Sequence, residues 1–248
     1  MIKYVLKGNT AIIILNRPEK RNALHPELIK QFKEKLKEAE KDENVKAVII
    51  TGEGKAFCAG ADLEYLKELS RFSSVENEKD SGELAELFLM IYKFPKPTIA
   101  AVNGAAIAGG CGLATVCDLI VAHPDHSKFG YSEVKIGFIP AIVSIFIIKR
   151  IGEGIAKQLL LTGEIINGKR AYELGLANFL YNNVLDGALE VASNILKNSA
   201  FSMQLTKSMI NTVSNLSVED AVNYCIRLNA VSRGSADFKK GLESFIKK

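Results

Sequence analysis

The chain of 248 residues, with a mass of 27.1 kDa, is long enough to bury a sizeable core. Its hydrophobic content of 48% and charged content of 24% are typical of a soluble globular protein. The net charge of +4 comes from lysines and arginines scattered among acids, without a dense basic run interleaved with aromatics, which argues against nucleic acid as the main partner.

Short apolar runs that end at turn residues predict buried strands. These runs cover residues 11–15, 45–51, 99–102 and 119–122. A helix is predicted over residues 26–39, because Pro26 opens a segment whose apolar positions follow helical spacing. Strands that alternate with helices predict an α/β fold with parallel pairing. Residues 73–80 are polar and rich in acids, and we expect them to form a mobile surface loop.

Beyond about Asp186 the strand signals stop and amphipathic helices follow one another to the end. They are predicted at residues 188–196, 203–213, 218–231 and 238–246. We therefore divide the chain into an α/β core, residues 1–186, and a helical region, residues 187–248. So much apolar helical surface either caps the core or packs on a second subunit.

No signal peptide is expected, and the four cysteines contain no C-x-x-C pair, so we expect reduced thiols in a cytoplasmic protein. The longest apolar stretch, residues 136–148, is too short to span a membrane. No metal site is expected: His123 and His126 lack a third ligand at suitable spacing and are interpreted as part of a turn.

Two segments of small residues are the strongest functional signal in the chain. The sequences are Ala56-Phe57-Cys58-Ala59-Gly60-Ala61-Asp62 and Asn103-Gly104-Ala105-Ala106-Ile107-Ala108-Gly109-Gly110-Cys111-Gly112. Each follows an apolar run and leads into a predicted helix, where small residues let a ligand approach bare N–H groups. The amides of Ala61 and Gly109 could together form an oxyanion hole, whereas each turn taken alone is more simply explained by close packing.

Further motifs stand in order along the chain. They are Asn16-Arg17-Pro18, Arg21-Asn22-Ala23-Leu24, Ala59-Gly60-Ala61-Asp62, Lys96-Pro97-Thr98-Ile99-Ala100-Ala101-Val102-Asn103-Gly104, Cys117-Asp118, Phe129-Gly130-Tyr131-Ser132-Glu133, Leu160-Leu161-Thr162-Gly163, Ala171 and Gly175-Leu176-Ala177. With these motifs the chain resembles the enoyl-CoA hydratase/isomerase (crotonase) superfamily over essentially its whole length.

The resemblance implies a crotonase-like spiral of ββα units followed by a C-terminal helical trimerisation region, assembled as a homotrimer or a dimer of trimers. It implies an acyl-CoA thioester as substrate and no cofactor beyond that coenzyme A moiety. The amides of Ala61 and Gly109 would hold the thioester oxygen. The residues expected to bind the substrate are Lys20, Arg21, Ala23, Ala59, Asp62, Leu63, Gly110 and Lys248. Among them, Lys20 and Arg21 would meet the CoA phosphates, and Lys248 would reach a neighbouring subunit's ligand.

Glu133 matches one of the two catalytic glutamates of the hydratases, and an apolar acyl pocket would raise its pKa into a useful range. The alternative is a surface glutamate in a loop. Gly112 stands where two-glutamate hydratases carry the second carboxylate, so that group is missing.

A single base suits isomerisation of a 3-enoyl thioester, in which one group moves a proton from Cα to Cγ. Yet Gly112 and the stretch Ser132-Glu133-Val134-Lys135-Ile136-Gly137-Phe138-Ile139-Pro140-Ala141 also resemble some hydratase-like branches of the family. The sequence therefore predicts an enoyl-CoA hydratase with Glu133 as acid and base. The alternatives are a Δ3,Δ2-enoyl-CoA isomerase with the same glutamate and a CoA-ester-binding protein without turnover.

Overall fold

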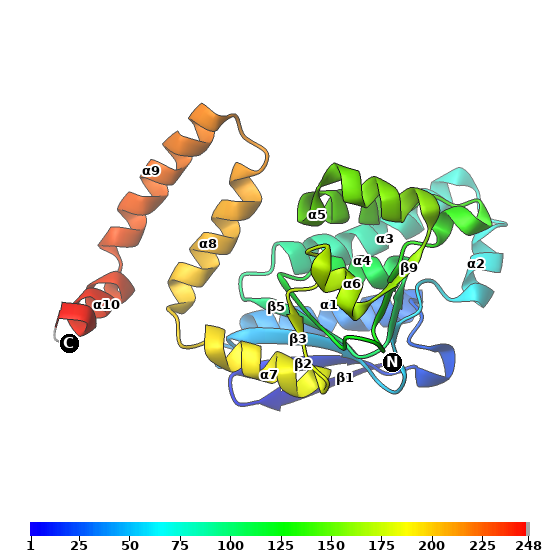
Figure 1. Ribbon diagram of the computed structural model, residues 1–248, viewed down its shortest axis with the longest axis horizontal. Helices are drawn as coiled ribbons and strands as arrows, with labels where there is room; N and C mark the ends of the chain where they lie inside the picture. Colours follow the sequence, from blue (N-terminus) through cyan, green and yellow to red (C-terminus); the bar gives the residue numbers. More distant parts are fainter. Residues whose placement is uncertain (247–248) are drawn as a thin grey trace.

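The computed structural model describes residues 1–246, apart from the side chains of Leu63 and Phe245. Its strands form two sheets (Figure 1). The larger sheet has the order β1 (Ile2–Lys7), β2 (Thr10–Leu15), β3 (Ala47–Gly52), β5 (Thr98–Val102), β7 (Leu119–Ala122) and β10 (Phe179–Leu180). The smaller has the order β4 (Ala56–Cys58), β6 (Ala105–Ile107), β8 (Lys128–Gly130) and β9 (Ile165–Asn167). Pairing is parallel except in β1–β2 and β8–β9, which confirms the predicted α/β class.

From β3 to β8, consecutive strands alternate between the two sheets, and this alternation generates a spiral. β3, β5 and β7 lie in the larger sheet, and each is followed by a short strand of the smaller sheet, β4, β6 or β8. A helix then follows each pair: α2 (Leu63–Leu69), α4 (Gly109–Thr115) and, after the short helix η2 (Glu133–Ile136), α5 (Ala141–Thr162). The repeated unit is therefore ββα, as the resemblance implied.

The larger sheet is covered on both faces because its strands alternate their apolar side chains. On one face Ile12, Ile49 and Ile99 pack with α7 (Val184–Ile195). The other face packs with α1 (Pro26–Lys41) and the smaller sheet. Because β3 is buried on both faces, its sequence is a nearly continuous apolar run and does not alternate between apolar and polar residues.

Residues 73–80 do not form the predicted surface loop; they begin helix α3 (Ser74–Tyr92). The Ser73 hydroxyl accepts a hydrogen bond from the Glu76 N–H, and the Glu76 carboxylate accepts one from the Ser73 N–H, a capping box that starts the helix. The buried residues of α3 are Leu87, Phe88 and Ile91, near its end. Its first half therefore lacks the apolar periodicity that would have revealed it.

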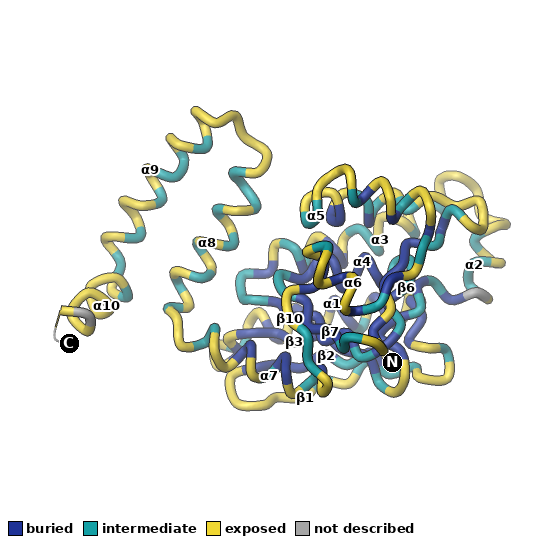
Figure 2. Tube along the Cα trace, in the orientation of Figure 1, coloured by how far each residue is buried: buried dark blue, intermediate teal, exposed yellow. Residues whose placement is uncertain are grey.

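The last helices, α8 (Ala200–Val213), α9 (Val218–Gly234) and α10 (Ala236–Ile246), extend away from the body (Figure 1). They are largely exposed, whereas the body has a buried interior (Figure 2). Their exposed apolar side chains include Ile210, Val222, Ile226, Val231, Phe238, Leu242 and Ile246.

The predicted boundary at residue 186 falls inside α7, which packs on the larger sheet. Assembly through this region stays a prediction.

The remaining helices within residues 1–246 are the short η1 (Pro18–Lys20) and α6 (Gly168–Glu173). None of the helices in this part of the chain has the length and apolarity needed to cross a membrane.

Candidate active site

The two turns of small residues lie directly against each other. They follow β4 and β6, which pair in parallel, so both turns leave the same end of the smaller sheet. A Cβ placed on Gly110 would lie 2.0 Å from the carbonyl oxygen of Cys58, and one on Gly60 would lie 2.9 Å from the carbonyl oxygen of Ile107. Glycine at these two positions is what allows this close approach. The structure thus brings together the neighbourhoods of Ala61 and Gly109.

The N–H groups of Ala61 and Gly109 are available at this junction. The Leu24 N–H donates to the Gly60 carbonyl (2.7 Å), and the Leu24 carbonyl accepts from the Asp62 N–H (3.0 Å). These two bonds leave the N–H of Ala61, which lies between Gly60 and Asp62, without a bond to Leu24. Gly109 is the first residue of α4, so its N–H precedes the hydrogen bonds of that helix. Within the described residues neither amide donates a hydrogen bond to another protein group, and both residues are only partly buried. Two such amides can bind a carbonyl oxygen or an oxyanion.

Ala108, immediately before α4, has φ +50° and ψ −124°, a backbone conformation that residues other than glycine rarely adopt. Its N–H donates to the Gly130 carbonyl (2.7 Å), which holds this conformation. We expect Ala108→Gly to raise the free energy of unfolding by about 1 kcal/mol, because relief of strain outweighs the added freedom of the unfolded chain. Chemical denaturation measures this effect, and a destabilised variant would contradict the strain.

Glu133 begins η2, three residues after strand β8, and its carboxyl group is buried in the structure. The pairing of β8 with β6 brings this segment beside the start of α4. Within the described residues Oε2 has no hydrogen-bond partner. Burial raises the pKa of Glu133, and the hydrogen bond from its own main chain offsets only part of that rise. A buried carboxyl group with one oxygen left without a protein partner within the described residues is a usable acid or base.

The raised pKa of Glu133 predicts a pH-dependent cost to stability. Below the ordinary pKa of 4.5 the group is protonated in both folded and unfolded chains and costs nothing. As the pH rises through the higher folded pKa, the unfolded chain releases its proton first, so stability falls. Glu133→Gln removes this cost, and the melting temperature of the variant minus that of the wild type should be larger at pH 8 than at pH 4.

A matched control for this measurement is Glu153→Gln on the surface. The hydrogen bond from Lys157 lowers the pKa of Glu153, so its pH effect should be small and of opposite sign. A Glu133→Gln difference that does not grow with pH would contradict the burial of an ionisable carboxyl group.

Most of the residues predicted to bind the substrate lie around the first turn, and Gly110 lies in the second. The Ala59 N–H donates to the Arg21 carbonyl (3.0 Å), and Ala23, two residues after Arg21, is buried. Arg21 is exposed, and Lys20 is partly exposed and forms an ion pair with Glu64 (2.9 Å). This places cations at the surface beside the turn, while their contact with a substrate stays a prediction.

Asp62 is held by the protein itself. It is buried, pairs with Arg17 (3.0 Å) and accepts the Glu64 N–H (3.0 Å) as the N-cap of α2. Burial alone would raise the pKa of Asp62, but the hydrogen bonds from Arg17 and Glu64 outweigh it and lower the pKa. Leu63 begins α2 with its side chain outside the described part, and Lys248 lies outside the described residues.

Sequence reasoning left Arg17 without a role, although its guanidinium joins Asp62 and the Ala23 carbonyl (3.1 Å) in this network. It also left Asn22 without one. Asn22 is buried with φ +56°, and its amide donates to the Glu53 and Ala56 carbonyls. The motif Asn16-Arg17-Pro18 was visible in the sequence, but a pairing across this distance in the chain has no local signal.

Cys58 and Cys111 are buried beside the two turns, and burial raises the pKa of both thiols to about 12. They are therefore thiols rather than thiolates near neutrality, which supports their interpretation as packing residues.

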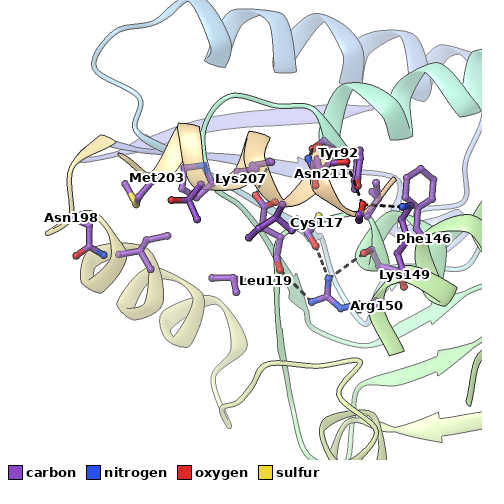
Figure 3. A pocket seen from close by; sticks show the side chains of 18 of the residues that line it. Tyr92, Cys117, Leu119, Phe146, Lys149, Arg150, Asn198, Met203, Lys207 and Asn211 are labelled. Carbon is purple, nitrogen blue, oxygen red and sulfur yellow. Dashed lines mark hydrogen bonds and ion pairs between the residues drawn. The ribbon is translucent and has the colours of Figure 1, made fainter. Parts of the chain in front are cut away.

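A cavity of about 700 Å³ lies elsewhere, between α8 and the body. Figure 3 shows Lys207 of α8 and Arg150 of α5 among its lining side chains. Lys207 pairs with Asp118 (2.7 Å), and Arg150 donates to the Cys117 carbonyl (2.7 Å). Ala61, Gly109 and Glu133 do not line this cavity.

The comparisons with known proteins agree with this fold. The family model of enoyl-CoA hydratase/isomerase matches residues 6–248. A Thermus thermophilus protein that carries an enoyl-CoA hydratase name is 42% identical over 98% of this chain and 97% of its own length. The crotonyl-CoA hydratase of Syntrophomonas wolfei is 32% identical over 96% of this chain and 92% of its own length.

A crystal structure of an enoyl-CoA hydratase from Shewanella pealeana superposes with a TM-score of 0.94 at 29% identity, covering 99% of this chain and 93% of the other. Together these matches span the α/β body and the C-terminal helices. The chain belongs to the enoyl-CoA hydratase/isomerase family.

Proposed function

We propose that the protein is an enoyl-CoA hydratase that uses Glu133 as its single acid–base group. The observation that supports this most is the buried Glu133 carboxyl group without a partner for Oε2 among the described residues. It lies in the segment joined by strand pairing to the turn that presents the Gly109 amide. The hydratase names of the relatives favour the same reaction.

In the proposed reaction Glu133 takes a proton from water as the water oxygen bonds to Cβ of the enoyl thioester. The electrons of the double bond move toward the thioester carbonyl and give an enolate. The N–H groups of Ala61 and Gly109 donate to its oxygen and stabilise the developing charge. Glu133 then returns its proton to Cα, so that the net change is the addition of one water molecule.

A second candidate is Δ3,Δ2-enoyl-CoA isomerase, and the surroundings of Gly112 favour it. A Cβ at Gly112 would lie 2.2 Å from Cγ1 of Val143, so the space beside Gly112 is filled by an apolar side chain. Glu133 alone could take a proton from Cα and return it at Cγ, with the same amides stabilising the enolate.

The experiment that decides is turnover of crotonyl-CoA against 3-hexenoyl-CoA by the purified protein. Hydration of crotonyl-CoA as the faster reaction supports the hydratase. Faster conversion of the 3-enoyl thioester supports the isomerase instead. Binding of both thioesters without turnover of either would leave a CoA-ester-binding protein and overturn both proposals.

A further inference from the structure

Gly112 has no room for a side chain because Val143 occupies it. A Cβ at position 112 would meet Val143 Cγ1 at 2.2 Å, Val143 Cβ at 3.0 Å and Phe88 Cε2 at 3.1 Å. All three residues are buried, and they come from α4, α5 and α3. The side chain of one helix thus fills the space left by the absent side chain of another.

This contact lies close to the groups of the proposed reaction. The Gly112 N–H donates to the Ala108 carbonyl (3.0 Å), one turn from the Gly109 amide. Val143 lies in the first turn of α5, which packs against the short helix that Glu133 begins. Burial and, to a smaller extent, the nearby Glu133 carboxylate raise the pKa of Cys111, the neighbour of Gly112. The Val143–Gly112 contact is therefore part of the wall beside the site.

The chemistry of that wall limits the reaction. Val143 has no donor or acceptor, and Gly112 offers no side chain, so this wall can neither hold a water molecule nor move a proton. A polar residue at 112 cannot be accommodated while Val143 stays, since its Cβ would overlap Val143.

We propose that Val143, packed on Gly112, is a specificity-determining residue that keeps a second acid–base group out of the site and leaves both proton transfers to Glu133. This inference rests on the proposed function. It predicts that positions 112 and 143 must change together before a second carboxylate can act.

The first test is a stability cycle, independent of activity. Gly112→Ala should lower the melting temperature by about 3–10 °C, because the new methyl group overlaps Val143. In the Val143→Gly background, Gly112→Ala should lower the melting temperature much less, so that the effects of the two substitutions on stability are not additive. The control is Gly154→Ala in α5, where an added Cβ meets nothing within 4 Å and no loss is expected. Additive effects at 112 and 143 would overturn the inference.

The second test is activity. Gly112→Glu combined with Val143→Gly should hydrate crotonyl-CoA at least about tenfold faster than Val143→Gly alone, because a second carboxylate can then orient the attacking water. It should also reduce the loss caused by Glu133→Gln. A folded double variant that is no faster than Val143→Gly would overturn the inference while wild-type turnover leaves the proposed function intact. A wild type without turnover of either thioester would overturn both.

Discussion

Glu133→Gln should lower the turnover of the enoyl thioester by about 100- to 10,000-fold, the range that loss of a general acid–base group costs. Glutamine keeps the size of the side chain but can neither accept the proton from water nor return one to Cα. Steady-state kinetics with crotonyl-CoA and 3-hexenoyl-CoA measure the loss, and binding of the thioester should persist because the two turns are unchanged.

The surface variant Glu153→Gln, whose parent side chain pairs with Lys157, should keep wild-type turnover. If Glu133→Gln retains turnover within about tenfold of the wild type, roughly 1.4 kcal/mol in the barrier, Glu133 is not the acid–base group.

Gly110→Ala should damage both stability and activity. The added Cβ would lie 2.0 Å from the oxygen and 2.7 Å from the carbon of the Cys58 carbonyl, so main chain must move. We expect a loss of about 3 kcal/mol in the free energy of unfolding, or about 6–12 °C in melting temperature. Displacement of the two turns should also lower turnover by about 100-fold, because donor positions tolerate little error.

Gly82→Ala in α3 is the matched control, since a Cβ there meets nothing within 4 Å. Alanine favours a helix over glycine by about 1 kcal/mol, so this variant should be as stable as the wild type or more so, with unchanged turnover. Equal behaviour of the two variants in thermal denaturation and kinetics would show that the turns are not tightly packed.

The long buried elements could be predicted from the sequence because their apolar patterns are local. Residues 11–15, 99–102 and 119–122 lie in β2, β5 and β7, and the helix predicted from Pro26 is α1. The strands of the smaller sheet were not predicted, because β4, β6, β8 and β9 have three residues each and too little pattern to recognise.

The candidate site likewise has parts that the sequence could predict and parts that it could not. Ala61, Gly109 and Glu133 could be singled out because each stands in a recognisable motif, and the structure brings their segments together. The Val143–Gly112 contact could not be predicted, although Gly112 was noted as a departure from the family pattern, because the contact depends on the packing of α5 on α4. The partnership of Arg17 with Asp62 likewise needed coordinates.

The N–H groups of Ala61 and Gly109, which donate to no other protein group within residues 1–246, belong to the peptide backbone rather than to side chains. Ordinary point mutations leave such groups in place, so they are inherited with the strand order itself. In the proposed mechanism, exchange of neighbouring residues can therefore give new reactions on this scaffold, while the groups that stabilise the enolate persist through sequence divergence.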